Sequence, residues 1–197
     1  MDSNISSTFR ILDTSRIHQG DMLKDFELSK RITNQNNPNF ELNDLPFCFI
    51  ISQDCDLEGM TNLNSIIKNR YFDKNNAING NKFLPSIIYA PAFVANDVNN
   101  GSYLIDLGYR MDNKGGKNKS KWKSIVNNND PRYHYIDSNE LGIEDLVIDF
   151  KIFFTAPYDD IFSRYPNSYK CSLNELFRER LSQRFFEYHV RIGLPPV

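Results

Sequence analysis

The chain has 197 residues, and its 23 Lys and Arg against 25 Asp and Glu give a formal net charge of −2. This length fits a single domain, over 1–197, that can bury a self-sufficient hydrophobic core. Aromatic residues make up 13% of the chain, which excludes wholesale disorder, and the near-neutral charge excludes a uniformly basic nucleic-acid coat of the histone kind.

The three cysteines, Cys48, Cys55 and Cys171, form no C-x-x-C pair, so neither a disulfide scaffold nor a structural zinc site is expected. The first 15 residues form a polar lead-in without the pattern of a signal peptide. The longest apolar run, over 47–51, is far shorter than a membrane span. We therefore expect a cytoplasmic protein that does not enter a membrane.

The first half of the chain reads mostly as strands and turns. A turn over 18–21 precedes a strand over 22–28, and a polar loop is expected over 31–44. The apolar run 47–51 predicts a central strand, and a short helix is expected near 64–71.

Prolines and a turn signal shape the next elements. Pro85 and Pro91 remove two backbone donors, so the extended segment over 83–94 is expected at a sheet edge or as two short strands. The triplet Asn99-Asn100-Gly101 predicts a hairpin that leads into a strand over 103–107.

In the second half, short strands precede a helix. We expect strands over 132–136 and 146–154, the second with Asp149 and Lys151 on its outer face. A capping box of Ser172 and Glu175 predicts a helix over 172–193 that packs on the sheet and ends at Gly193. The stripe that packs on the sheet is expected to contain Leu173, Leu176, Phe177, Leu181, Phe185, Tyr188 and Ile192. The order favours an α+β fold, with a small curved antiparallel sheet or SH3-like barrel and a C-terminal helix.

Polar side chains crowd the segment after the central strand, where binding sites are often built. In one interpretation the site is catalytic, with Asp54, Cys55 and Asp56 approached in space by His134. In a second, Asp54, Asp56 and Glu58 hold a divalent metal, the only cofactor that the sequence suggests. In a third, the carboxylates cap a turn and Cys55 packs as a small apolar residue.

A second candidate site is the lysine-rich segment 114–123, which contains no acidic residue. Its lysines can neutralise phosphates and its single tryptophan can stack on a base, so it is a candidate nucleic-acid contact. The residues of this contact are Lys117, Lys119, Lys121, Trp122 and Lys123. The alternative is a solvated segment in which Trp122 turns inward and anchors a short helix through Val126.

Three short motifs give the first half of the chain a resemblance to the PemK/MazF-like toxins. They are Gly20-Asp21 at the first strand, Pro46 followed by the apolar run that ends at Ser52, and Ile87 to Pro91. The resemblance implies an SH3-like barrel and ribosome-independent cleavage of messenger RNA. Leu45 stands where the family usually has Arg, and Ala92 and Phe93 stand where it usually has Thr or Ser, so its catalytic groups are not carried over. The segment Ser52–Asp56 also resembles uncharacterised bacterial proteins.

These observations lead to one expected function and two alternatives. We expect a binding or regulatory subunit of a bacterial intracellular conflict system, of the phage-defence or toxin–antitoxin type, that contacts nucleic acid or a partner protein. The first alternative is an enzyme, either a toxin-like endoribonuclease or a metal-dependent phosphodiesterase that uses Asp54 and Asp56. The second is a protein–protein adaptor that works through its C-terminal helix or an edge strand.

Overall fold

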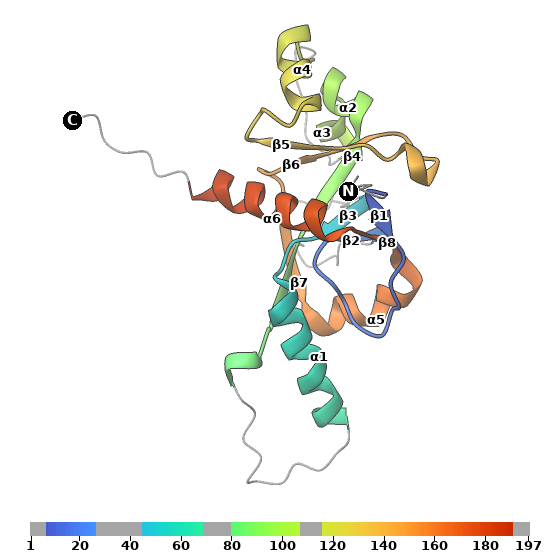
Figure 1. Cartoon of the computed structure of the whole chain (residues 1–197), viewed down its shortest axis with the longest axis vertical. Coiled ribbons are helices and arrows are strands. Elements are labelled where there is room, and N and C mark those ends of the chain that lie inside the picture. Colours follow the sequence, from blue (N-terminus) through green and yellow to red (C-terminus); the bar gives the residue numbers. More distant parts are fainter. Residues whose placement is uncertain (1–6, 27–44, 69–79, 107–115, 191–197) are drawn as a thin grey trace, which may run out of the picture.

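One curled antiparallel sheet organises the protein, for which a computed structural model describes residues 7–26, 45–68, 80–106 and 116–190 (Figure 1). Its strands run in the spatial order β1-β8-β2-β3-β4-β6-β5, and β7 pairs with β4. The strands are β1 (Phe9–Arg10), β2 (Asp21–Phe26), β3 (Leu45–Ile50), β4 (Ser86–Val94), β5 (Tyr133–Ile136), β6 (Leu146–Asp149), β7 (Phe154–Pro157) and β8 (Tyr169–Leu173). The predicted α+β class, with a curved antiparallel sheet and a C-terminal helix, is confirmed.

Helices cover both faces of the sheet, and each face has its own hydrophobic cluster. α6 (Glu175–His189) packs on one face through Leu181 and Phe185. The helices that pack on the other face are α1 (Asp54–Lys68), α2 (Ala95–Asn100), α3 (Tyr103–Asp106), α4 (Lys119–Val126) and α5 (Tyr158–Ser168). Two 3-10 turns, η1 (Gly80–Lys82) and η2 (Asn139–Leu141), complete the described elements, and no helix among them is long and apolar enough to span a membrane.

The prediction of a central strand at 47–51 is confirmed by β3. Cys48 and Ile50 face the cluster under α1 and α5, whereas Phe49 and Ile51 face the cluster under α6. Since successive side chains of a strand point to opposite faces, an apolar run without alternation fits a strand that is buried on both sides.

β4 corrects the expectation of an edge strand, because it lies inside the sheet with neighbours on both sides. On one side it pairs with β3. On its other side two strands follow each other along it: β7 pairs with Ser86–Tyr89 and β6 with Ala92–Val94. Pro91 falls between these two paired stretches, where the missing backbone donor interrupts neither ladder. Pro85 precedes the strand.

The hairpin and strand expected over 99–107 are wrong where the structure describes them, because Tyr103–Asp106 is helical and Leu107 lies outside the described residues. Gly101 adopts the left-handed conformation with φ of 88° and donates its N–H to the carbonyl of Asp97, so it ends α2. Tyr103 then packs its ring against Phe93 at 4.9 Å between centroids.

The strands predicted over 132–136 and 146–154 have different outcomes. β5 confirms the first, whereas the second divides into β6 and β7 around a turn at Phe150 and Lys151. Lys151 is exposed as expected, but Asp149 has no exposed surface. The inward position of Asp149 is possible because the guanidinium of Arg132 binds its carboxylate.

The C-terminal helix is confirmed, but its predicted start is wrong. Ser172 belongs to β8, and its hydroxyl donates to Asp21 at 2.5 Å instead of capping α6. The helix follows Asn174, which makes no side-chain cap hydrogen bond. Leu176, which we placed on the packed stripe, is 67% exposed, whereas Leu181 and Phe185 are buried. The predicted end at Gly193 lies outside the described residues.

The outer edge of β5 is occupied by a side chain of the preceding turn. Asn128 Nδ2 donates to the carbonyl of Tyr135 at 2.9 Å, and Asn128 Oδ1 accepts the backbone N–H of Tyr135 at 2.8 Å. Asn128 thus fills the hydrogen-bonding positions that another strand would use there.

Candidate functional site

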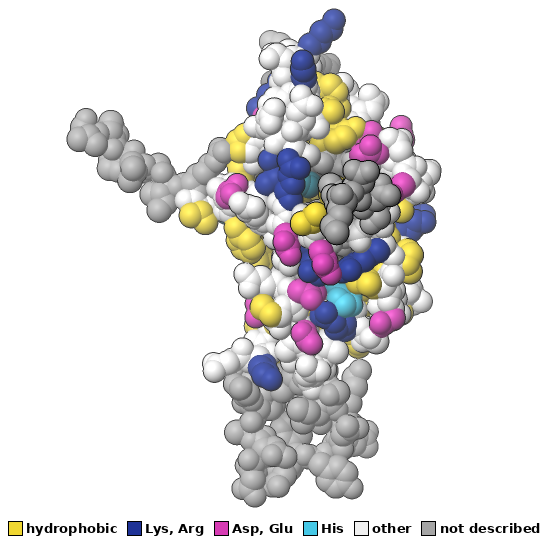
Figure 2. All heavy atoms as spheres, viewed as in Figure 1, with side chains coloured by type: hydrophobic (Ala, Val, Ile, Leu, Met, Phe, Trp, Pro, Cys, Tyr) yellow, Lys and Arg dark blue, Asp and Glu magenta, His cyan; other side chains and the backbone are white. Residues whose placement is uncertain are grey.

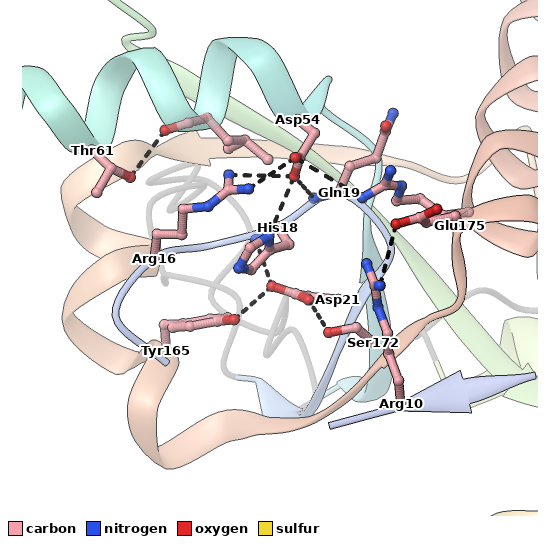
Figure 3. Close-up of polar contacts among 12 residues, drawn as sticks. Arg10, Arg16, His18, Gln19, Asp21, Asp54, Thr61, Tyr165, Ser172 and Glu175 are labelled. Carbon is pink, nitrogen blue, oxygen red and sulfur yellow. Dashed lines mark hydrogen bonds and ion pairs between the residues drawn. The ribbon is translucent and has the colours of Figure 1, made fainter. Parts of the chain in front are cut away.

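Asp54, the first residue of α1, lies at the centre of a charged cluster (Figure 3). Its carboxylate accepts from the guanidinium of Arg16 at 3.0 Å and from the backbone N–H of Gln19 at 3.1 Å. His18 Nδ1 lies 3.5 Å from the carboxylate, and a guanidinium nitrogen of Arg178 on α6 lies 3.9 Å away. We call Arg16, His18, Asp54 and Arg178 the Asp54 cluster; it joins three segments that are distant in sequence.

The electrostatics of the Asp54 cluster keep this carboxylate ionised. Burial alone would raise the pKa of Asp54, but hydrogen bonds from His18, Arg16 and the Gln19 N–H outweigh burial and hold that pKa well below its usual range. Both carboxylate oxygens already accept hydrogen bonds or ion pairs within the cluster. Asp54 therefore acts in this structure as a hydrogen-bond acceptor that holds the basic side chains of the cluster together.

The structure does not gather the other predicted residues of this segment around Asp54. Cys55, Asp56 and Glu58 are exposed on the first turns of α1, and Cys55 Sγ lies 3.8 Å from Asp56 Oδ1. Within the described ranges, no three His, Cys, Asp or Glu side chains come close enough together to hold one metal ion. The cysteine nucleophile and the metal set stay predictions without a converging partner among these residues.

His134, the predicted companion of Cys55, lies elsewhere. It belongs to β5, and β4 and β6 separate this strand from β3, which precedes Cys55. The ring of His134 lies 6.1 Å from that of Phe150, in the cluster under α6, whereas α1 packs on the opposite face. The structure therefore does not bring His134 to the Asp54 segment.

His18 is the histidine that Asp54 does meet, and sequence reasoning missed it. Its Nδ1 faces Asp54 at 3.5 Å. A carboxylate that orients one imidazole nitrogen leaves the other nitrogen available for proton transfer, and the two arginines can hold an anion nearby. The sequence signal was only the turn over 18–21, and no spacing connects residue 18 with residue 54.

A buried carboxylate supports the turn that carries His18. Asp21 accepts the His18 backbone N–H at 2.6 Å and the hydroxyls of Tyr165 at 2.6 Å and Ser172 at 2.5 Å (Figure 3). Burial raises the pKa of Asp21, although hydrogen bonds from Ser172 and Tyr165 oppose the rise. Gly20 precedes it with φ of 80°, and an added Cβ there would lie 2.9 Å from Arg178 Cγ.

Most of the lysine-rich segment forms α4. Asn118 caps this helix by accepting the N–H of Lys121 at 2.8 Å, and Ile125 is fully buried. Trp122 is half-buried and meets the ring of Tyr135 edge to face at 6.5 Å between centroids. Trp122 therefore helps to anchor the helix, as in the alternative prediction.

The lysines of this segment differ in their surroundings. Lys119 and Lys123 are exposed on α4, whereas Lys121 forms an ion pair with the buried Asp130. Lys117 lies 5.8 Å from the centre of the Tyr133 ring, and burial, followed by neighbouring cations, lowers its pKa. Lys114 and Gly115 lie outside the described residues.

A buried ion pair beside Lys117 also escaped sequence reasoning. Asp149 accepts from Arg132 Nε at 2.8 Å and from Arg132 Nη2 at 2.5 Å, and the hydroxyl of Tyr103 donates to it at 2.8 Å. The hydrogen bonds to Asp149 raise the pKa of Arg132, which stays charged. The pair fixes the turn after β6 against the start of β5.

Basic side chains of α6 extend the charged surface next to α4. Arg184 donates to the carbonyls of Asn128, Asp130 and Tyr133, in the segment that directly follows α4. Arg180 is exposed one helical turn earlier. Figure 2 shows lysine and arginine side chains over α4 and between β5 and α6 on the same face of the molecule.

The end of α6 carries an apolar groove. Phe186 and Val190, with Gln183 and Glu187, line a groove of about 490 Å³. Val190 is exposed, and so is Phe153 beside Phe185. An adaptor that acted through its terminal helix would present this apolar surface to its partner.

Comparisons with known proteins give no match from which a function could be inferred. No protein-family model matches the chain. No curated protein matches it either.

Proposed function

We propose that this protein binds nucleic acid as a binding or regulatory subunit of a bacterial conflict system of the phage-defence or toxin–antitoxin type. The observation that carries the proposal is α4, a firmly anchored helix that exposes Lys119 and Lys123. The resemblance to PemK/MazF-like toxins supports the setting.

The anchoring of α4 matters because flexible lysines lose conformational entropy on binding. The Asn118 cap and the buried Ile125 hold the helix backbone, so only the lysine side chains must be ordered. Arg180 adds a third exposed cation on α6, the helix whose Arg184 binds the segment that follows α4. We call Lys119, Lys123 and Arg180 the basic surface; it is a local excess of positive charge on a chain of net charge −2.

Salt dependence tests the proposal. Fluorescence anisotropy with labelled single-stranded RNA and DNA, measured between 50 and 200 mM salt, gives the number of phosphates neutralised. Each phosphate contact adds roughly 0.7 to the slope of log affinity against log salt for a single strand, so three contacts predict a loss of about 20-fold over this range. A flat response, or no binding at the lowest salt, refutes nucleic-acid binding.

A matched pair of charge reversals locates the contact. Lys119→Glu with Lys123→Glu should abolish most of the binding, whereas Lys82→Glu with Lys170→Glu changes the net charge equally at exposed positions outside α4. Equal losses in both double variants would mean that overall charge, and not the basic surface, drives association. Capture of a protein without any nucleic-acid binding would favour the adaptor alternative.

The Asp54 cluster favours a second candidate function, a metal-independent endoribonuclease. The specific observation is the His18–Asp54 contact of 3.5 Å beside the guanidinium groups of Arg16 and Arg178. His18 Nε2 would take the proton of an RNA 2′-hydroxyl while this oxygen bonds to phosphorus. The bond from phosphorus to the 5′-oxygen would break, and this oxygen would receive the proton back from the His18 imidazolium through a water molecule, giving a 2′,3′-cyclic phosphate and a 5′-hydroxyl. The arginines would stabilise the additional negative charge on the phosphoryl oxygens.

Cleavage assays with a chelator present test this candidate. We expect the protein to cleave RNA but not a 2′-deoxy substrate, and His18→Ala to abolish cleavage. His189→Gln is the matched control, because His189 lies at the end of α6 and bonds the carbonyl of Phe150. Cleavage that survives in His18→Ala, or that requires a divalent metal, rules out this mechanism.

A further inference from the structure

Where β5 meets α6, a buried histidine and a half-buried arginine each keep one unpaired polar atom. His134 is 5% exposed, and its Nδ1 is shielded from solvent without a hydrogen-bond partner. Nε of Arg184 is shielded and unpartnered in the same way. Buried polar atoms almost always find a partner, so two such atoms from adjacent elements need an explanation.

These groups lie on the sheet face that α6 covers. On β5, His134 and Ile136 point to the face packed by Leu181 and Phe185, because strand side chains alternate and Ile136 belongs to that cluster. Arg180 and Arg184 are four residues apart, and so they share one face of α6. Both arginines lie close enough to His134 to lower its pKa, after the larger effect of burial, to about 3.

The chemistry of the three groups suits an oxyanion. A neutral imidazole donates one hydrogen bond from Nδ1 in the appropriate tautomer, Arg184 Nε–H donates a second, and the exposed guanidinium of Arg180 donates further ones. The remaining nitrogens of Arg184 already bind three backbone carbonyls, so its position is set without a ligand. The acidic groups that face Arg184 are Glu187, which accepts from Gln183, and Asp130, which pairs with Lys121.

The position of these groups connects them with the basic surface. The three carbonyls that Arg184 binds belong to the segment 128–133, which joins α4 to β5. A nucleic-acid strand across α4 that continued along this segment would place a phosphate beside α6.

We propose that His134, Arg180 and Arg184 form a seat for one backbone phosphate of a nucleic acid bound across α4, with Arg180 moving to admit it. This inference rests on the proposed nucleic-acid binding and names the chemistry that the sheet face under α6 contributes to it. It assigns His134 a binding role apart from the Asp54 segment, where sequence reasoning placed it.

Inorganic phosphate probes the seat without nucleic acid. Long-range ¹H–¹⁵N spectra of the ¹⁵N-labelled full chain report the ring nitrogens of its three histidines separately. We expect phosphate, but not sodium chloride of equal ionic strength, to shift the signals of His134 and leave those of His189 in place. Arg180→Gln should abolish the shift while thermal unfolding stays unchanged, because Arg180 is exposed.

Nucleic-acid binding provides the second measurement. Arg180→Gln should reduce the slope of log affinity against log salt by roughly 0.7 on a single strand, as expected for the loss of one phosphate contact. Lys170→Gln, which removes a charge from an exposed position on β8, should leave the slope unchanged.

The outcomes separate the seat from the proposed function. Nucleic-acid binding through α4 with no response of His134 to phosphate, and with an unchanged slope in Arg180→Gln, overturns the seat alone. A response of His134 to phosphate in a protein that binds no nucleic acid refutes the proposed function and also overturns the seat as a site for nucleic-acid phosphates. The expected result is both responses in the wild type and the loss of both in Arg180→Gln.

Discussion

Replacing Arg132 by Met should destabilise the protein more than any loss of surface charge. Asp149 has no exposed surface, and the guanidinium of Arg132 supplies two of its hydrogen bonds, at 2.8 and 2.5 Å. Among the described residues, the Tyr103 hydroxyl and the Lys151 N–H then still donate to the carboxylate. Removing one partner of a buried ion pair costs about 3–5 kcal/mol of unfolding free energy, and the two remaining donors place this case near 3 kcal/mol.

A double-mutant cycle shows whether the loss of stability comes from the Asp149 carboxylate that is left buried without its cation. Asp149→Asn alone should cost about 1–2 kcal/mol, because the Arg132 side chain is 32% exposed and can be solvated. The double variant should cost about 2 kcal/mol, since it buries no unpaired charge, so the coupling energy should reach about 2–3 kcal/mol.

Urea unfolding measures all three variants, with far-UV circular dichroism and the fluorescence of the single tryptophan, Trp122, as probes. Arg10→Met is the matched control: its partner Glu175 lies 3.5 Å away and is exposed, so its loss should cost under about 1 kcal/mol. Additivity of the two single changes within about 0.5 kcal/mol would refute the reasoning that a stranded buried charge dominates.

Four further changes test other parts of the structure. Gly20→Ala should destabilise by at least about 1–2 kcal/mol in urea, because φ is 80° and the new Cβ meets Arg178; a change near zero would contradict the backbone assignment. Asp54→Asn should cost most near pH 7 and progressively less below about pH 4, because a lowered folded pKa gives stability that is lost as pH falls through it. Asp21→Asn should show the opposite trend, since a raised folded pKa gives stability that is lost as pH rises through it; parallel pH profiles of the two variants would refute the opposite shifts. Asn128→Ala should cost about 1–3 kcal/mol and speed hydrogen exchange at the Tyr135 amide, and unchanged exchange there would show that the side chain does not hold the edge.

Periodic patterns predicted the parts of the fold that local physics controls. The unbroken apolar run of β3 indicated burial on both faces, and the spacing of Leu181 and Phe185 placed a helix at the C-terminal end of the described residues. In both cases the hydrophobic effect acts on residues close in sequence, so the pattern alone contains the information.

The errors occur where a distant partner decides the outcome. Ser172 has the spacing of a helix cap, but the buried carboxylate of Asp21 takes its hydroxyl. Asp149 has the alternation of an outward residue, but Arg132 makes its burial favourable. No local window contains both members of either pair, and tertiary contacts therefore override propensity.

The candidate sites follow the same division. The polar residue Asp54 was recognisable because it follows an apolar strand, a local signal. Its companions His18 and Arg178 come from other segments, and only the folded sheet brings them within 4 Å of its carboxylate. The lysines of α4 were likewise visible in sequence, whereas the ion pair of Lys121 with Asp130 depends on the turn that follows the helix.

The position of β8 between β1 and β2 has a consequence for how the protein folds. Phe9 pairs with Leu173 and Asp21 with Ser172, so this side of the sheet closes only when β8 is present beside β1 and β2. A chain emerging from the ribosome cannot join β1 to β2 until β8 has been made, and contacts of such high sequence separation form slowly. Removing residues from 172 onward would therefore delete part of the sheet together with α6, and the nascent chain must keep β2 soluble until β8 has been made.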